Sequence, residues 1–497
     1  MEKSFLLRAC LALSLLLCLA FPVLHILFYV PFTSLTWDPF LSPVLLGATV
    51  QALLSSVLTL LLGFLGALGL AQNQVIMTPG RFRVLVFALI LPSFLPPLLI
   101  VSLIVGFFGF VPMGLAGVIF FHVFMNVGLV SVLMASTLVN DMTRALRESQ
   151  VMAIGNWKTV GEVILPLIRI DLALLFFYLF VLFFFSFSIP LLVGGSLFGG
   201  IEVFIYEKIL LYGQWSEAVQ YSIILFLTLF FLSQFFKSTS RPMDMSQPLS
   251  AMTLQGMGRR ILIFFPLLPT FLLLAGLLWS AVTIKWEFAG LELLKSARGT
   301  LTVGLIVSSG VFVFLSLLSF SFLNQFLSQV LLSFINPGWV LVGFSFLLLG
   351  LSGKLANLLL LGVALTLAYV PFLFRLSFSR QLQQIESQVR FAQSFPVSWR
   401  RIFLRVIWPQ TLAPICFLSG LAGLWACGDF AMSEIILGSN EIRTLAMDIK
   451  VLLSTYRLEK ALLLLYPLLI VSFIVFFIFQ GLAYVSCRNI SSRSWTL

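Results

Sequence analysis

With 60% hydrophobic residues and only 9% charged residues over 497 positions, this chain is too apolar for a water-soluble protein, because soluble domains carry about 25% charged residues. The formal net charge of +11 does not require a nucleic-acid partner. An excess of Lys and Arg on the cytoplasmic side of a membrane protein explains such a charge equally well. We therefore expect the lipid bilayer to be the solvent.

Twelve long apolar runs follow one another along the chain. A membrane-spanning helix needs about 20 mostly apolar residues, and the runs are continuous, whereas the strands of a transmembrane barrel alternate apolar and polar positions. The sequence therefore predicts an all-α polytopic membrane protein with about twelve transmembrane helices. The runs cover residues 5–30, 44–71, 84–111, 114–138, 170–194, 217–236, 261–284, 299–323, 326–351, 355–376, 411–437 and 461–486.

The Lys and Arg residues divide unevenly between the two sides that these runs define. If the N-terminus is cytoplasmic, 20 of the 29 cations fall on the cytoplasmic side. Cytoplasmic segments of membrane proteins carry such an excess. We expect both termini to be cytoplasmic and the chain to lie in a bacterial inner membrane.

A polar stretch at 237–260 lies between the first six apolar runs and the last six. We expect it to be a cytoplasmic linker between two halves, residues 1–236 and 261–497. Both halves carry the word ESQV after their fourth run, at Glu148–Val151 and Glu386–Val389. An even number of spans per half places both words on one side of the membrane. The sequence therefore predicts two six-helix repeats in parallel orientation.

Two segments that follow the fourth run of each half, 141–166 and 381–409, are short, mixed in charge and helix-favouring. Each ends where a proline begins the next helix. A short helix at the membrane surface can enter a groove on a cytosolic partner and pass movement to the spans. The alternative is an ordinary cytoplasmic loop that carries positive-inside charges.

These segments resemble the "EAA" coupling loops of ATP-binding-cassette (ABC) importer permeases. That pattern has a Glu followed by two Ala, a later Gly, and a closing Leu-Pro; here Ser-Gln replaces Ala-Ala in both copies, and the second copy lacks the Gly. The resemblance implies contacts with a motor ATPase, and it covers Glu148, Gly155, Trp157 and Pro166 in the first half and Glu386, Trp399 and Pro409 in the second.

The resemblance narrows to the fused two-half permeases for thiamine and ferric iron. It is carried by CGDF at 427–430 and by LGSNEIRTLAMDIKVLLSTYR at 437–457. It implies a type I ABC importer permease fold, thiamine or its phosphates as substrate, and ferric iron or another small solute as the alternative.

The same resemblance implies that this chain is not an enzyme and binds no cofactor. Two copies of a separate ATPase subunit would bind and hydrolyse ATP. An extracytoplasmic binding protein would dock on the charged outer segments near 202–217 and 441–459. A twelve-span secondary carrier is the rival interpretation, and it would need coupling carboxylates within the membrane.

Polar residues inside apolar runs are the remaining candidates for the translocation path. Asp429 lies within the eleventh run beside Phe430 and Trp425, and a carboxylate with aromatic rings suits a cationic substrate; a local helix cap or an interhelical hydrogen bond is the alternative. His122 and Asn126 share a helix face and have the same two interpretations. The sequence shows no nucleotide-binding loop and no metal-ligand spacing.

Overall fold

The computed structural model describes residues 2–30, 38–110, 112–151, 158–195, 199–235, 257–286, 290–321, 338–350, 353–438 and 442–493. These ranges contain helices and turns and no strand. Nine of their helices are long and apolar enough to cross a membrane, or ten if one bent pair counts as a span. The prediction of an all-α, membrane-embedded protein is confirmed, whereas the count of twelve spans stays a prediction.

The helices of the first sequence half are α1 (Glu2–Tyr29), α2 (Leu41–Ile76), α3 (Pro79–Phe94), α4 (Pro97–Phe108), α5 (Gly114–Val151), η1 (Thr159–Ile164), α7 (Leu165–Phe184), α8 (Ser188–Val193), α9 (Gly200–Leu210) and α10 (Trp215–Phe235).

The helices of the second half are α11 (Met257–Thr283), α12 (Gly290–Ser321), α14 (Trp339–Leu347), α15 (Lys354–Leu373), η2 (Phe374–Phe378), α16 (Ser379–Gln393), α17 (Trp399–Ile402), η3 (Phe403–Ile407), α18 (Trp408–Cys427), α19 (Ala431–Leu437), α20 (Leu445–Ser454) and α21 (Leu458–Arg493). The three η segments are π-helical turns.

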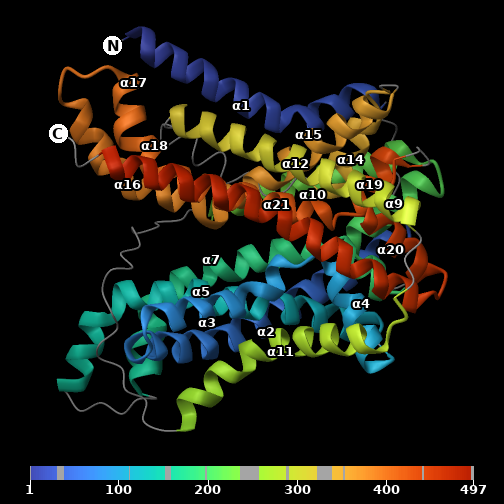
Figure 1. The fold of residues 1–497 in the computed structure, drawn as a ribbon, viewed down its shortest axis with the longest axis horizontal. Helices are drawn as coiled ribbons and strands as arrows, with labels where there is room; N and C mark the ends of the chain where they lie inside the picture. The colour runs from blue at the N-terminus through green and yellow to red at the C-terminus, as the bar shows by residue number, and fades with distance from the viewer. Residues whose placement is uncertain are drawn as a thin grey trace. The chain divides into compact units, whose positions relative to one another are not determined.

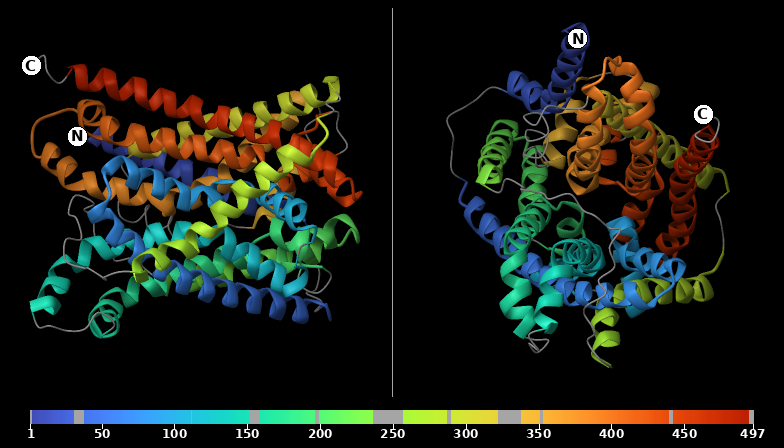
Figure 2. Two further views of the ribbon diagram at one scale, coloured as in Figure 1. Left: turned by 60° about the horizontal axis from the view of Figure 1, so that its bottom comes forward. Right: turned by 90° about the vertical axis from the view of Figure 1, so that its left-hand side faces the viewer.

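Two compact units form the protein, and neither follows the linear order of the chain. Unit 1 comprises residues 1–37, 204–240 and 285–497, and unit 2 comprises 38–203 and 241–284. Within unit 1, α1 lies against α12 and α14 (Figure 1). Within unit 2, α11 lies against α2, α3 and α4 (Figure 2). The first helix of each sequence half therefore belongs to the unit built mainly from the other half.

A stripe of three glycines brings α2 close to its neighbours in unit 2. A Cβ atom at Gly63 would lie 2.5 Å from Val130 Cγ1, and one at Gly66 would lie 2.2 Å from Ser131 Oγ. A Cβ at Gly69 would lie 3.1 Å from the backbone nitrogen of Ile263. These helices approach so closely because the glycines have no side chain. Glycine at every third position thus allows α2 to pack closely against both α5 and α11.

The third apolar run, predicted as one helix, is a bent pair. The axes of α3 and α4 differ in direction by 95°. Leu95 between them is extended, with φ −81° and ψ 145°, because a residue before proline is driven out of the helical region. Pro96 then precedes a second proline and is extended as well. Hydropathy continues unchanged across this break, so the run looked like one span.

The fifth and eleventh runs also end earlier than predicted. α7 ends at Phe184 and α18 at Cys427, and each is followed by three non-helical residues and a short helix, α8 or α19. The prediction that Asp429 lies within a spanning helix is therefore wrong, because Asp429 lies in the second of these breaks. From this point, both halves continue with the same order of one short helix, one medium helix and one long helix.

Candidate functional site

The second predicted coupling segment folds into α16, an exposed turn, α17 and η3. The helix α16 is amphipathic, since Leu382, Ile385 and Val389 are buried at a spacing of three and four residues. Glu386, on its exposed side, accepts from the guanidinium of Arg390 one turn later, at 2.5 Å. Such a pair contributes about 0.3–0.5 kcal/mol to a surface helix, so Glu386 stabilises α16 itself.

Three apolar side chains stand exposed where the chain turns from α16 to α17: Phe391 is 68% exposed, Phe395 50% and Val397 43%. The two phenylalanine rings pack edge to face with centroids 5.1 Å apart. We call these three residues the apolar tip. Exposed apolar residues that gather in one place mark surfaces for partners.

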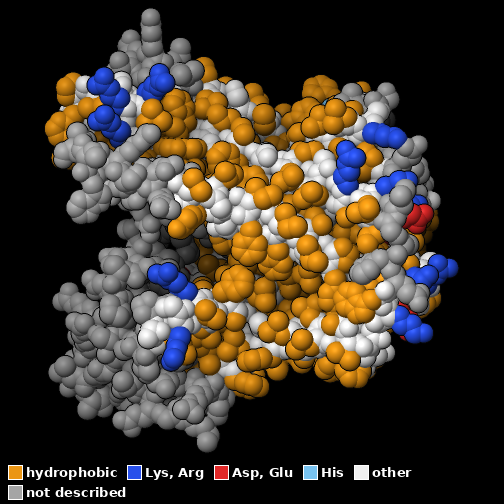
Figure 3. Space-filling model, viewed as in Figure 1, with side chains coloured by type: hydrophobic (Ala, Val, Ile, Leu, Met, Phe, Trp, Pro, Cys, Tyr) orange, Lys and Arg blue, Asp and Glu red, His pale blue; other side chains and the backbone are white. Residues whose placement is uncertain are grey.

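Arginines follow the apolar tip along the chain. Arg400, Arg401 and Arg405 are exposed. In Figure 3 one group of Lys and Arg side chains lies at the end of unit 1 that carries α17, and other groups lie elsewhere on this face. The tip therefore presents apolar contacts next to positive charge, which suits a partner surface that is apolar and acidic.

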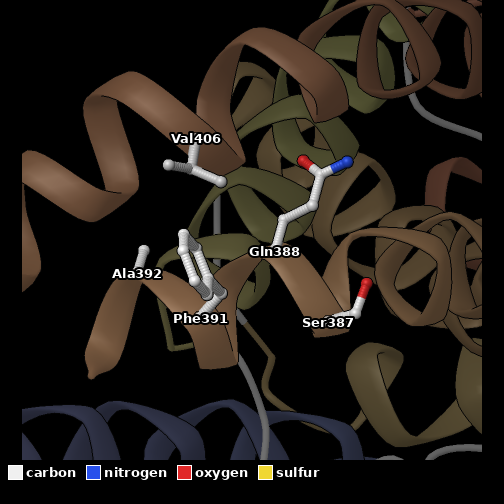
Figure 4. Close-up of a pocket in the computed structure, with 5 residues that line it drawn as sticks. All are labelled: Ser387, Gln388, Phe391, Ala392 and Val406. Carbon is white, nitrogen blue, oxygen red and sulfur yellow. The ribbon is translucent and has the colours of Figure 1, made fainter. Parts of the chain in front are cut away.

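A pocket of about 420 Å³ opens beside the tip, between α16 and η3 (Figure 4). Ser387, Gln388, Phe391 and Ala392 line it from α16, and Val406 faces them from η3. The amide of Gln410 in α18 donates to Gln388 Oε1 at 2.7 Å. The pocket is thus tied to the first turn of the following long helix.

Trp399 is buried, with 9% of its surface exposed. Its indole Nε1 donates to the carbonyl oxygen of Phe320 in α12 at 3.0 Å. The guanidinium carbon of Arg8 in α1 lies 4.0 Å from its ring centroid. Trp399 therefore holds α17 in place within unit 1 and does not present its ring to a partner.

Pro166 and Pro409 lie at matched positions in the two halves. Each is the second residue of a long helix, α7 or α18, and each follows a π-helical turn, η1 or η3. A proline has no N–H to donate to the preceding turn, and a π-turn is one way to accommodate the missing bond. Such turns are frequent at functional sites.

The first predicted coupling segment is only partly described. Glu148 lies within α5. Its side chain, together with Gly155 and Trp157, lies outside the described residues. The roles assigned to these three residues stay predictions.

Asp429 caps the short helix α19. Its Oδ1 accepts from the backbone N–H of Met432 at 2.9 Å and of Ser433 at 3.4 Å, which is the usual work of an acidic residue at a helix start. The local cap, one of the two interpretations of this residue, is present. The role of Asp429 toward a cationic substrate stays a prediction.

Aromatic residues surround this helix break. The Trp425 ring lies 5.7 Å from Tyr369 and 5.5 Å from Phe372, centroid to centroid. Phe430 is buried, and Lys450 Nζ lies 5.9 Å from its ring while pairing with Glu434. Three predicted path residues, Trp425, Asp429 and Phe430, therefore lie at one break in unit 1.

His122 and Asn126 lie in unit 2. The Oγ of Ser55 in α2 lies 3.4 Å from His122 Nδ1, and the imidazole stacks on Phe183 with centroids 4.5 Å apart. The Asn126 amide donates to the carbonyl of His122 at 2.9 Å. His122 thus makes the interhelical contact that was the alternative to lining a path, with Ser55 and Phe183 as partners that lie far away in the sequence.

The two charged segments near 202–217 and 441–459, which we predict to lie outside the cell, contain helices, α9 and α20, and many of their charges are paired. Lys208 donates to Gln214 at 2.6 Å and to Glu217 at 3.3 Å. Asp448 lies 3.7 Å from Arg443. Burial and the nearby carboxylates of Glu434 and Glu207 raise the pKa of the Tyr206 phenol. Sequence reasoning treated these segments as loops because charges interrupt their apolar pattern.

Tyr456, just after α20, has a left-handed backbone with φ 57° and is 96% exposed. Its backbone N–H donates to the carbonyl of Leu453, and Arg457 donates to Leu452, which closes the C-terminus of α20. Glycine usually occupies such a position. No sequence pattern marked this strained residue.

The residues that the structure describes contain no group of three or more His, Cys, Asp or Glu side chains that could hold a metal ion. Comparison with known proteins found no matching family model, no matching curated protein and no matching solved structure.

Proposed function

We propose that this chain is the fused two-half permease of an ATP-driven, binding-protein-dependent importer in a bacterial inner membrane. One copy of a separate ATPase subunit would bind each coupling segment, and those subunits would hold and hydrolyse the ATP. An extracytoplasmic binding protein would deliver a small-molecule substrate. In this proposal the chain moves its substrate and makes or breaks no covalent bond.

The single observation that carries this proposal is the apolar tip beside exposed arginines at the end of a short amphipathic helix. Two phenylalanines and a valine exposed together on one turn are more typical of a partner surface than of an ordinary loop that carries positive charges. Burial of the three side chains in a partner would remove that apolar area from water, which is favourable by about 25 cal/mol per Å². A groove with apolar walls and an acidic rim on the ATPase fits this surface best.

The route from the tip into the membrane is one continuous helix. α18 begins at Trp408, next to the π-turn η3, and its 20 residues end at Cys427. At 1.5 Å per residue this is about 30 Å, the thickness of a bilayer core. Movement of the coupling segment would therefore be delivered to the break at Asp429.

Thiamine or its phosphates are the substrates that we propose for this path. The support is the set of residues at the α18–α19 break, where the Asp429 carboxylate caps α19 and the ring of Trp425, which precedes it in the sequence, packs on Tyr369. A carboxylate with aromatic faces attracts an organic cation. Ferric iron or another small solute is the alternative substrate.

Purification of the full-length chain from its native membrane tests the broad proposal. We expect an ATPase subunit to co-purify and Phe391→Ala to weaken its retention several-fold. Phe477→Ala is the matched control, because Phe477 in α21 is 62% exposed and lies outside the coupling segment. Transport that continues with no ATPase bound would favour the secondary carrier.

Uptake of labelled solutes tests the substrate. Cells that lack the chain would be compared with cells to which it has been restored, with thiamine in one arm and a ferric chelate in the other. We expect the chain to restore thiamine uptake. Restoration of iron uptake alone would reject the thiamine proposal and leave the importer proposal standing.

A further inference from the structure

The contact between Arg8 and Trp399 joins two elements that are far apart in the sequence. Arg8 is near the start of α1, and Trp399 is the first residue of α17 in the second coupling segment. The guanidinium carbon lies 4.0 Å above the indole ring centroid. At this distance an arginine is attracted by the ring face and stacks on it.

Trp399, the aromatic partner in this contact, is also bonded to α12. The Trp399 indole donates to the carbonyl of Phe320 in α12 at 3.0 Å. One side chain therefore makes a hydrogen bond to α12 while its ring face receives Arg8 from α1. Both interactions restrict where α17 can lie.

A chain of aromatic rings continues from this point along unit 1. The centroid of Phe403 in η3 lies 5.0 Å from that of Phe320 and 5.6 Å from that of Trp408. Trp408 in turn lies 6.3 Å from Phe312 in α12. These rings pack the π-turn and the start of α18 against the same helix that anchors Trp399.

We propose that Arg8 is a positioning residue, which clamps the second coupling segment to the first helix of the chain so that α1, α12 and α17 move together. This inference rests on the proposed importer function. Because α1 is the first helix of the first sequence half but packs in unit 1, the clamp would link the N-terminal helix to the force that enters through the apolar tip.

The simpler interpretation is that Arg8 only holds its charge at the membrane interface. A lysine would serve that purpose equally well, but it lacks the planar guanidinium that stacks on an indole. Arg8→Lys therefore separates the two interpretations. Arg83→Gln is the control for loss of one cation, since Arg83 is exposed on α3.

The first arm of the test measures the contact in the purified permease alone. Melting temperatures would be taken for Arg8→Gln, Trp399→Leu and the double variant. We expect the double variant to melt close to Trp399→Leu, because the arginine has nothing left to stack on. Losses that add in full would overturn the clamp. This arm needs no ATPase, so its result is independent of the proposed function.

The second arm measures positioning in the complex of permease and ATPase in vesicles, as ATP hydrolysed per substrate transported. We expect Arg8→Gln to raise this ratio about threefold, the size of an exposed cation–π contact, Arg8→Lys to raise it in the same direction, and Arg83→Gln to leave it unchanged. A wild-type ratio for Arg8→Lys would overturn the inference. Failure of any ATPase to associate would instead reject the proposed function.

Discussion

Gln410 donates its side-chain amide to Gln388 Oε1 at 2.7 Å, across 22 residues of chain. The bond joins the middle of α16 to the first turn of α18, beside the pocket that Phe391 and Val406 line. The same amide also donates to the carbonyl of Val406 at 3.1 Å. The surface helix and the long helix are thus held together next to the turn that the tip occupies.

Removal of this bond should loosen the coupling segment without unfolding the protein. We expect Gln388→Ala to cost about 1 kcal/mol, the net value of one hydrogen bond, since Gln410 keeps its second acceptor. Gln393→Ala, an exposed change on the same helix, is the control. Chemical unfolding in detergent measures both variants, and equal stabilities would show that the bond contributes nothing.

Two substitutions at Asp429 separate its role as a helix cap from the role of its negative charge in transport. An asparagine keeps an oxygen that can accept from Met432, so Asp429→Asn should leave stability nearly unchanged, while Asp429→Ala should lose about 1 kcal/mol of cap energy. If the charge attracts a cationic substrate, Asp429→Asn should still lose transport. Uptake and melting temperature measured on the same variants decide the matter, and full transport by a stable Asp429→Asn would leave Asp429 as a cap alone.

Tyr456 should be replaceable with a gain in stability. Its φ of 57° costs a non-glycine residue about 1–2 kcal/mol, so Tyr456→Gly should raise the melting temperature. Tyr456→Ala removes the same ring but keeps the strain, and should not. If the exposed ring serves a binding protein, both variants should lose stimulation by that protein; a melting temperature for Tyr456→Gly at or below that of Tyr456→Ala would contradict the strain argument.

Gly128 should tolerate no side chain. A Cβ there would lie 1.8 Å from the backbone oxygen of Leu89 in α3, and backbone cannot rotate away as a side chain can. We expect Gly128→Ala to destabilise the protein by about 1–3 kcal/mol, as overpacking does. The control is Gly80→Ala on α3, where a Cβ meets nothing within 4 Å. Comparable melting temperatures for the two variants would show that α3 and α5 can separate at little cost.

The helical, membrane-embedded character of the chain could be predicted because it follows from hydropathy alone. The breaks could not be located in that way. Leu95 and Asp429 lie inside apolar stretches, and a sliding window does not register that two prolines or a Gly-Asp pair end a helix there. The glycine stripe on α2 was predictable from its spacing, but its partner Ile263 in α11 was not, since the exchange of first helices between units leaves no local signal.

The site was predictable in position but less so in the role of each residue. The duplicated word and its proline led to the second coupling segment, where the exposed tip lies. The resemblance to the coupling loops predicts Trp399 as a motor contact, but a resemblance carries no information on whether the side chain is buried. The burial of Trp399 depends on Arg8 in α1, near the start of the chain, and on Phe320 in α12. Both residues lie far from Trp399 in the sequence. Long-range contacts of this kind decide whether a motif residue faces a partner or the interior.

The central claim is that an ATPase subunit acts on the permease through the apolar tip. A crosslink from that tip to the ATPase tests this claim most directly. Val397 is 43% exposed, and a cysteine would be placed there after Cys10, Cys18 and Cys487 are replaced by serine. A cysteine at Tyr456, expected on the opposite side of the membrane, is the control. We predict that Val397→Cys crosslinks in whole membranes to a separate ATPase subunit and that Tyr456→Cys does not. Labelling of Val397→Cys from outside the cell, or transport by the chain with no ATPase attached, would contradict the central claim.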